Sequence, residues 1–235
     1  MQGTVSADEV ARFDALAARW WDPNGPMRPL HRMNPARLAW IEDRVARAFP
    51  GAAGLRVLDV GCGAGLAAEA LARRGFDVLG IDAAPDVIAA AAAHAAGAGL
   101  ALAYRVAAPE DLAAEGARFP IVTALEVIEH VPDPALFLRI LAGLLEPGGL
   151  LVLSTLNRTA LSFAAAKIGA EYVLRWLPVG THDWRRFLTP AELARELRKA
   201  GLRVSDLTGL GLDPVSGRWR VGGRRSINYM IAARG

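Results

Sequence analysis

A hydrophobic segment followed at once by three closely spaced glycines sets the strongest limit on the fold of this chain. Residues 55–60 are mostly apolar and predict a buried strand, and Gly61, Gly63 and Gly65 come directly after them. Glycine permits a tight turn and a close approach of a ligand to the backbone. The segment 66–74 then has helical character and ends at a glycine. The sequence therefore predicts a strand–turn–helix unit with a turn suited to holding a ligand.

The same alternation of strands and helices continues along the chain. Further elements are expected as strands at 77–81, 100–106, 121–125 and 150–154, and as helices at 85–96 and 134–146. Alternating strands and helices form a parallel sheet with helices on both faces. Two later strands, near 202–207 and 227–232, should pair antiparallel because no helix separates them. The predicted class is α/β, a Rossmann-like, mostly parallel sheet of seven strands with an antiparallel last strand and N-terminal helices.

The first part of the chain is expected to form a helical cap on this sheet. Ser6 and Glu9 have the spacing of a capping box that opens an amphipathic helix, and a second helix is expected over 34–48. A chain of 235 residues suits one decorated domain. The expected parts are the cap at 1–50 and the main domain at 51–235, which contains an amphipathic insertion at 161–183.

Composition points to a reducing compartment. Cys62 is the single cysteine, so a disulfide within one chain is excluded. We see neither the pattern of a secretory signal nor the run of about 20 apolar residues that a spanning helix needs. We therefore expect a cytoplasmic protein. Arginines cluster at 175–186 and 218–225, which fits a solvated surface or an anionic membrane face. Nucleic acid is not an expected partner, because no aromatic residues interleave with the basic ones.

Acidic residues near the glycine turn narrow the class of ligand. Asp59 precedes the turn, and Asp82 ends the next strand about 20 residues on, where an acid accepts hydrogen bonds from ribose hydroxyls. Leu66 stands where the dinucleotide fingerprint has its last glycine, so the spacing resembles the methyltransferase pattern instead. S-adenosylmethionine carries an amino acid and a sulfonium, which need an acid such as Asp59. A nicotinamide dehydrogenase and a turn without ligand are the alternatives.

Two softer positions follow the later strands. Glu110 and Asp111 come after the third strand, where many methyltransferases place an acid on the adenine amine, although helix capping explains them equally well. Leu125 ends the fourth strand and is expected to face the cofactor, although a buried strand end would also explain it.

Segments outside the glycine turn resemble the ubiquinone-biosynthesis O-methyltransferase family over nearly the whole chain. They are Arg19-Trp20-Trp21-Asp22, Pro29-Leu30-His31-Arg32-Met33-Asn34-Pro35, Ser154-Thr155-Leu156-Asn157-Arg158, Gly169-Ala170-Glu171-Tyr172, Gly180-Thr181-His182-Asp183-Trp184 and Asn228-Tyr229-Met230. These motifs are more specific than the glycine turn. The resemblance implies a class I methyltransferase that uses S-adenosylmethionine, with Arg37, Gly61, Asp82 and Leu125 at positions that bind it.

Glu126, Glu129 and His130 are the first candidates for catalysis. Their spacing of i, i+3 and i+4 would place them on one face if the segment is helical. Two carboxylates and an imidazole could hold Mg²⁺, Mn²⁺, Fe²⁺ or Zn²⁺, and the resemblance implies a metal there. Methyltransferases without a metal also carry this pattern, where it shapes the cofactor pocket. His182 is a second candidate, as base or substrate ligand, with a surface loop histidine as the alternative.

The resemblance also implies the acceptor and its surroundings. The family methylates ring hydroxyls of polyprenyl catechol and demethylubiquinol, and other ubiquinone-biosynthesis proteins are expected partners. Because the polyprenyl tail lies in the bilayer, the apolar and aromatic residues of 161–183 are expected to form an interfacial helix on an anionic membrane. This would place the protein peripherally on the inner face of the plasma membrane. A helix packed on the sheet is the alternative.

Two other functions compete with this one. The first is a methyltransferase for another small molecule or quinone without a lipid tail. The second is a scaffold that binds S-adenosylmethionine without catalysis, against which the intact glycine turn and the acidic residues argue.

Overall fold

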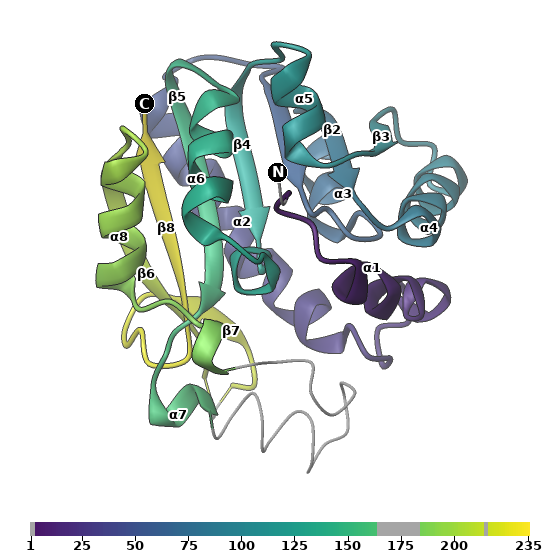
Figure 1. Cartoon of the computed structure of the whole chain (residues 1–235). Coiled ribbons are helices and arrows are strands. Elements are labelled where there is room, and N and C mark those ends of the chain that lie inside the picture. The colour runs from purple at the N-terminus through teal and green to yellow at the C-terminus, as the bar shows by residue number, and fades with distance from the viewer. Residues whose placement is uncertain (1–2, 164–183, 214–215) are drawn as a thin grey trace.

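One eight-stranded sheet runs through the molecule (Figure 1). The structure, a computed structural model, describes residues 3–163, 184–213 and 216–235. The strand order is β3-β2-β1-β4-β5-β8-β6-β7. The strands are β1 (Arg56–Val60), β2 (Asp77–Asp82), β3 (Ala103–Val106), β4 (Phe119–Leu125), β5 (Leu145–Leu156), β6 (Arg203–Leu212), β7 (Trp219–Val221) and β8 (Asn228–Arg234).

The pairing of the strands confirms the predicted class. The strands β1 to β5 pair in parallel, whereas β8 pairs antiparallel with both β5 and β6. The expected number of seven strands is wrong, because β7 adds an eighth, antiparallel to β6. A strand of three residues is too short to show an alternating pattern, and only its pairing with β6 defines it.

Helices cover both faces of the sheet. The first face carries α2 (Arg28–Ala48) and α3 (Leu66–Ala72), and the second carries α5 (Pro109–Ala114), α6 (Pro134–Gly143) and α8 (Pro190–Lys199). Side chains of β1 alternate between these layers, as expected for a strand. Val57 packs with α2 and α3, and Leu58 and Val60 pack with the helices of the second face. The helix α4 (Pro85–Gly97) packs against β2 and β3.

The second predicted helix begins earlier than expected. We predicted its start near residue 34, but α2 begins at Arg28 and contains Pro35 in its interior. A proline there cannot donate the usual backbone hydrogen bond, which normally weakens a helix. Met33, Leu38 and Ile41 are buried against the sheet, and this packing offsets the missing bond.

The N-terminal helix lies across the carboxyl ends of the strands (Figure 1). It is α1 (Ala7–Asp14), and the short helix η1 (Ala17–Arg19) follows it. Ser6 stands at its N-cap, but the predicted capping box is wrong, because the Ser6 side chain makes no cap hydrogen bond. The carboxylate of Glu9 instead contacts Arg12 and His130.

Three short helices complete the described part: η2 (Ile128–His130), α7 (Ala160–Ser162) and η4 (Trp184–Arg186). Most of the predicted insertion at 161–183, including His182, lies outside the described residues.

Among the described helices, none combines the length and the apolar character needed to cross a membrane.

Candidate functional site

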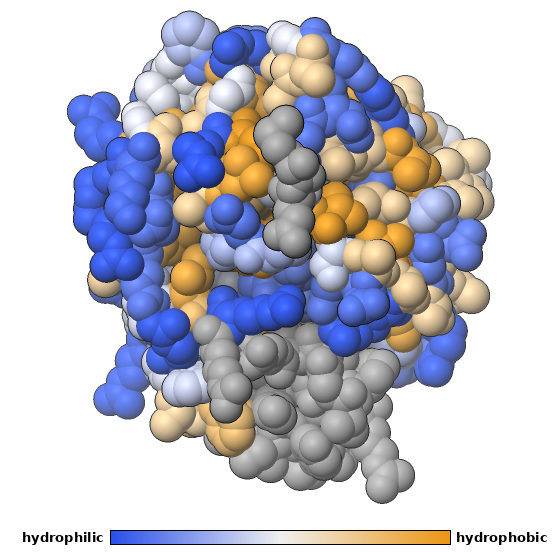
Figure 2. All heavy atoms as spheres, viewed as in Figure 1, coloured by the Kyte–Doolittle hydropathy of each residue, from blue (hydrophilic) through white to orange (hydrophobic). Residues whose placement is uncertain are grey.

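A pocket of about 710 Å³ opens at the carboxyl ends of β1, β2 and β4. Its walls come from α1, α2, the glycine turn, the segment after β4 and the β6–β7 hairpin. Figure 2 views this face, where apolar side chains gather beside a central hollow. The pocket brings together most of the predicted site residues, which are Arg37, Asp59, Gly61, Gly63, Asp82, Leu125, Glu126, Glu129 and His130. A volume of this size accommodates a small-molecule ligand.

The glycine turn fits closely against the N-terminal segment. Gly63 has φ +54°, and a Cβ atom there would lie 2.3 Å from Cζ2 of Trp20. A side chain at Gly63 would therefore clash with Trp20 as well as strain the backbone. Gly65 differs from the other two glycines, because it does not line the pocket. It begins α3 in a left-handed conformation, with the hydroxyl of Tyr104 packed against it.

Asp59 is a buried carboxylate with one oxygen available for a ligand. The residue is 2% exposed, and its Oδ1 accepts a hydrogen bond of 2.7 Å from Thr123 Oγ1. Its Oδ2 has no hydrogen-bond partner among the described residues. Burial raises the pKa of Asp59 to about 6, against the lowering effect of Thr123 and the Arg37 guanidinium. A cationic group of a ligand would complete this site.

Arg37 supplies a positive charge close enough to Asp59 to affect its pKa. It is 3% exposed and donates from one terminal nitrogen to Asn34 Oδ1 at 3.1 Å. Its Nε is buried and lacks a partner within the described part of the chain. Burial lowers the pKa of Arg37, whereas Glu126 and Asp59 raise it. The Asn34 side chain donates to Leu66 O, which ties this arginine to the start of α3.

Asp82 lines the pocket, and Glu110 follows the lining residue Pro109 at the start of α5. Asp82 accepts backbone hydrogen bonds of 3.0 Å from Gly63 and Ala84, so it fixes the glycine turn. Burial raises the pKa of Asp82, although these backbone donors lower it. Glu110 accepts from the Thr4 backbone at 2.5 Å, and its Oε2 is buried without a hydrogen-bond partner in the described ranges.

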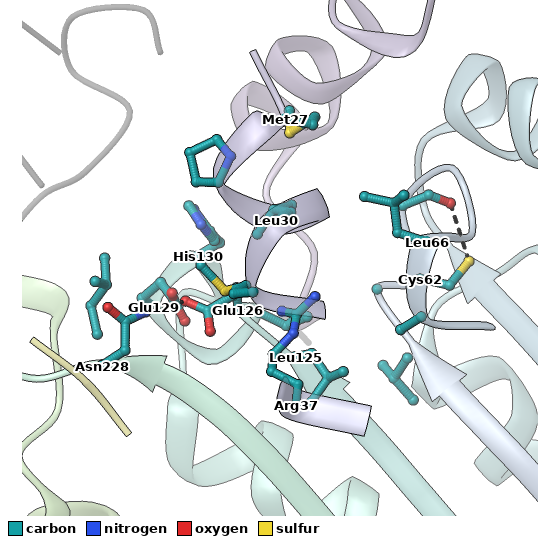
Figure 3. A pocket seen from close by; sticks show the side chains of 18 of the residues that line it. Met27, Leu30, Arg37, Cys62, Leu66, Leu125, Glu126, Glu129, His130 and Asn228 are labelled. Carbon is teal, nitrogen blue, oxygen red and sulfur yellow. Dashed lines mark hydrogen bonds between the residues drawn. The ribbon is translucent and has the colours of Figure 1, made fainter. Parts of the chain in front are cut away.

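Glu126 follows β4 in a strained conformation. Its φ is +58°, a left-handed value that costs a non-glycine residue about 1–3 kcal/mol. Ser154 Oγ donates to Glu126 Oε1 at 2.7 Å, and Asn228 Nδ2 donates to Oε2 at 3.2 Å. Two strands, β5 and β8, therefore hold both oxygens of this carboxylate at the pocket wall. Figure 3 shows Glu126 between Glu129 and Arg37.

Glu129 is a second buried carboxylate beside Glu126. It is 5% exposed, and Thr155 Oγ1 donates to its Oε2 at 2.8 Å. Burial, and then the charge of Glu126, raise the pKa of Glu129 to about 7. The pocket thus contains a carboxyl group that can accept and release a proton near neutral pH.

His130 contacts the N-terminal helix. Its Nδ1 lies 3.0 Å from Glu9 Oε2, and its ring meets the edge of Phe13 with 5.2 Å between ring centres. Burial alone would lower the pKa of His130, but the carboxylates of Glu9 and Glu129 raise it.

The helix that would place Glu126, Glu129 and His130 on one face does not form. Only Ile128–His130 is helical, and Glu126 has a left-handed backbone. The three side chains line one pocket, but the described ranges contain no group of three histidine, cysteine, aspartate or glutamate side chains placed to hold a metal ion.

Sequence reasoning missed the residues that orient these groups. Ser154, Thr155 and Asn228 lie in motifs that carry the family resemblance but suggest no role by themselves, and the spacing of Glu9 predicts a helix cap instead. For Ser154, Thr155 and Asn228, membership in these motifs is the only feature of the sequence that points to the site.

Known proteins share this architecture. A family model described as a methyltransferase domain matches residues 30–207. The fold is similar to that of magnesium protoporphyrin IX methyltransferase from Synechocystis with bound SAH, with a TM-score of 0.66, 20% identity, and coverage of 97% of this chain and 99% of that chain. An S-adenosylmethionine-dependent methyltransferase from Clostridium acetobutylicum gives a TM-score of 0.65 at 11% identity, with 92% and 96% coverage. The matching family model, together with this fold, defines a class I S-adenosylmethionine-dependent methyltransferase.

Closer relatives define the family. The ubiquinone biosynthesis O-methyltransferase of Azorhizobium caulinodans is 50% identical, over 98% of this chain and 94% of the relative. The protein of that name from Cereibacter sphaeroides is also 50% identical, with 98% and 96% coverage. The chain belongs to the ubiquinone biosynthesis O-methyltransferase family.

Proposed function

We propose that this protein transfers a methyl group from S-adenosylmethionine to ring hydroxyls of polyprenyl catechol and demethylubiquinol. The observation that carries the proposal is the 50% identity to ubiquinone biosynthesis O-methyltransferases over 98% of the chain. The pocket supports it, because buried carboxylates stand beside a site suited to the methyl donor. Binding to other ubiquinone-biosynthesis proteins stays a prediction of the resemblance.

The methyl donor would be held by charge complementarity. Asp59 Oδ2 would accept from the ammonium group of the methyl donor, and Arg37 Nε would donate to its carboxylate. Both atoms are buried and have no hydrogen-bond partner among the described residues. Asp82, which lines the pocket, would accept from the ribose hydroxyls, and the unpartnered Glu110 Oε2, next to the lining residue Pro109, from the adenine amine. Gly61 and Gly63 leave room for the ligand at the turn, and Leu125 offers an apolar contact.

The acceptor side requires removal of a proton. A sulfonium supplies an electrophilic methyl group, so the acceptor oxygen must approach it in line. Glu129, or Glu126 beside it, would take the proton from the acceptor hydroxyl as the oxygen forms its bond to the methyl group. The carbon–sulfur electron pair stays on sulfur and gives S-adenosylhomocysteine. Ser154, Thr155 and Asn228 keep the two carboxylates in place.

Metal dependence is a further prediction of the resemblance, with Glu126, Glu129 and His130 as ligands. Their donor atoms suit Mg²⁺, Mn²⁺, Fe²⁺ or Zn²⁺, but the arrangement described here does not assemble them as a metal site. His130 instead contacts Glu9, and Ser154 and Asn228 donate to Glu126. We therefore derive the proton transfer from the carboxylates alone.

The test is a methyl-transfer assay with a short-tailed catechol, run with and without a chelator. The proposed function predicts a methylated catechol together with S-adenosylhomocysteine. Absence of methyl transfer from protein that binds S-adenosylhomocysteine would contradict it. Metal dependence would be supported if the chelator abolishes turnover and one divalent cation restores it. Full turnover in the presence of the chelator would contradict metal dependence. His182 is tested in the same assay as a His182→Ala variant, which should lower turnover if it acts as a base or substrate ligand.

We also propose peripheral contact with an anionic membrane through 161–183, on the inner face of the plasma membrane. Leu161 is 53% exposed and Phe163 is 39% exposed, and apolar side chains of this kind favour an interface. A Leu161→Glu, Phe163→Glu double variant should float less with anionic liposomes and keep its affinity for S-adenosylhomocysteine. Unchanged flotation would contradict the proposal.

A further inference from the structure

We propose that the arm of the pocket between α2 and the β6–β7 hairpin binds the aliphatic tail of the acceptor, with Leu212 and Trp219 as its contacts. This inference rests on the proposed function, because it assigns a place to the tail of that acceptor. The occupant is an apolar chain attached to a catechol ring.

One face of the hairpin carries a continuous apolar row. Leu210 pairs with Val221, and Leu212 pairs with Trp219, across the antiparallel ladder. Directly opposite residues, and residues two apart, share a face of a β-ribbon. Leu210 is 1% exposed and lies in the core with α2, whereas Leu212 at the other end of the row is 50% exposed. The row therefore runs from the core to the surface.

This row forms a wall of the same pocket that contains the carboxylates. Leu210, Leu212 and Trp219 line the pocket, and Leu30 and Met33 of α2 line it as well. Leu210 and Met33 are buried in the same apolar cluster, against which Leu30 and Trp219 pack. An apolar chain there would replace water along Leu30, Leu212 and Trp219, which keep exposed surface.

The arm connects with the reacting groups at its inner end. Asn228 opens β8 and donates to Glu126, and both residues line the pocket together with Ile227 and Ser226. Figure 3 shows Asn228 and Glu126 on one side of the pocket and Cys62 and Leu66 of the glycine-turn region on the other. An acceptor ring near Glu126 would thus have the methyl donor on one side and the arm on the other.

The outer end of the arm is open. Arg220 also lines the pocket, and its side chain is 69% exposed. Arg224 also lines the pocket and is exposed. A polyprenyl tail is longer than any small-molecule pocket, so it needs an exit of this kind.

The experiment compares two acceptors in the full-length protein. One is a geranylated catechol, and the other is the same catechol with a methyl group in place of the tail. The measured quantity is the ratio of their kcat/KM values. In Leu212→Ser and in Trp219→Ala we expect this ratio to fall about tenfold, because apolar contact to the tail is lost. Val106→Ser is the matched control, because Val106 is 49% exposed on β3 outside the pocket, and it should keep the wild-type ratio.

A second readout does not depend on variant folding. A catechol with a photoreactive diazirine at the end of its alkyl tail is irradiated with wild-type protein, and the labelled peptides are sequenced. Labels on 210–212 or 219–224 support the arm. The proposal is overturned if labels are confined to other segments, or if both variants keep the wild-type acceptor ratio. Either result is expected if another part of this chain or a second copy of it covers Leu212. If wild type methylates neither catechol, the proposed function itself fails.

Discussion

Replacing Asp59 with asparagine should stabilise the ligand-free protein and weaken its binding of the methyl donor. Burial raises the pKa of Asp59 from its ordinary value of 3.8 to about 6. The folded state therefore holds this proton more tightly than the unfolded chain, and stability falls as pH rises from about 4 to about 6. At about 1.4 kcal/mol per pKa unit, the ionised carboxylate costs the folded state about 3 kcal/mol at pH 8.

The amide removes this cost because it has no charge to bury. Its oxygen can still accept from Thr123 Oγ1, but its nitrogen takes the place of Oδ2 and buries N–H donors without a partner, which costs about 1 kcal/mol. We therefore expect Asp59→Asn to raise the free energy of unfolding by about 2 kcal/mol at pH 8. The gain should shrink at pH 5, where the carboxyl group of wild type is largely protonated. Urea unfolding at both pH values measures it.

Binding should change in the opposite direction. A hydrogen bond to a charged group is worth about 1.5–3 kcal/mol, so affinity for S-adenosylhomocysteine should fall about ten- to hundredfold in Asp59→Asn. Calorimetry measures this affinity, and Asp77→Asn, at an exposed position of β2, serves as the control. A variant that is less stable than wild type at pH 8, or that binds as tightly, would refute the reasoning.

Two further predictions concern the turn and the carboxylates. Gly63→Ala should lower the free energy of unfolding by about 1–3 kcal/mol more than Gly75→Ala does, because both glycines have positive φ but only Gly63 faces Trp20. Urea unfolding measures both losses, and equal losses would contradict the close contact with Trp20. Thr155→Val removes the hydroxyl donor, so it should raise the pKa of Glu129 further and lower kcat/KM about tenfold. Thr155→Ser keeps a hydroxyl and should retain most of the activity. Equal activity in the two variants would argue against a role of the hydroxyl in supporting Glu129.

Local chemistry made much of the fold and the donor site predictable. The apolar strand, the glycines at 61 and 63 and the acids at the ends of two strands are close in sequence, and each has a fixed place in a strand–turn–helix unit. Asp59 and Asp82 consequently line the pocket as expected. Arg37 was found through motif resemblance alone, because its helix reaches the pocket only after α2 packs on the sheet.

The pocket wall that contains Glu126, Glu129 and His130 shows where local patterns mislead. The spacing of Glu126, Glu129 and His130 is helical, but the chain leaves β4 through a left-handed residue. Glu9 has the spacing of a capping residue, yet its carboxylate meets His130. In both cases a tertiary contact replaced the local interaction that the pattern favours.

The sequence by itself determined the order of the main strands and helices, the glycine turn and the family. The tertiary structure decided which side chains support the reacting groups and where the acceptor arm lies. Glu9 and His130 are 121 positions apart, and Asn228 and Glu126 are 102 apart. Such pairs meet only when the sheet is assembled and α1 crosses its edge. Hydrophobic burial drives that assembly, and it carries no record of these polar contacts in any short stretch of sequence.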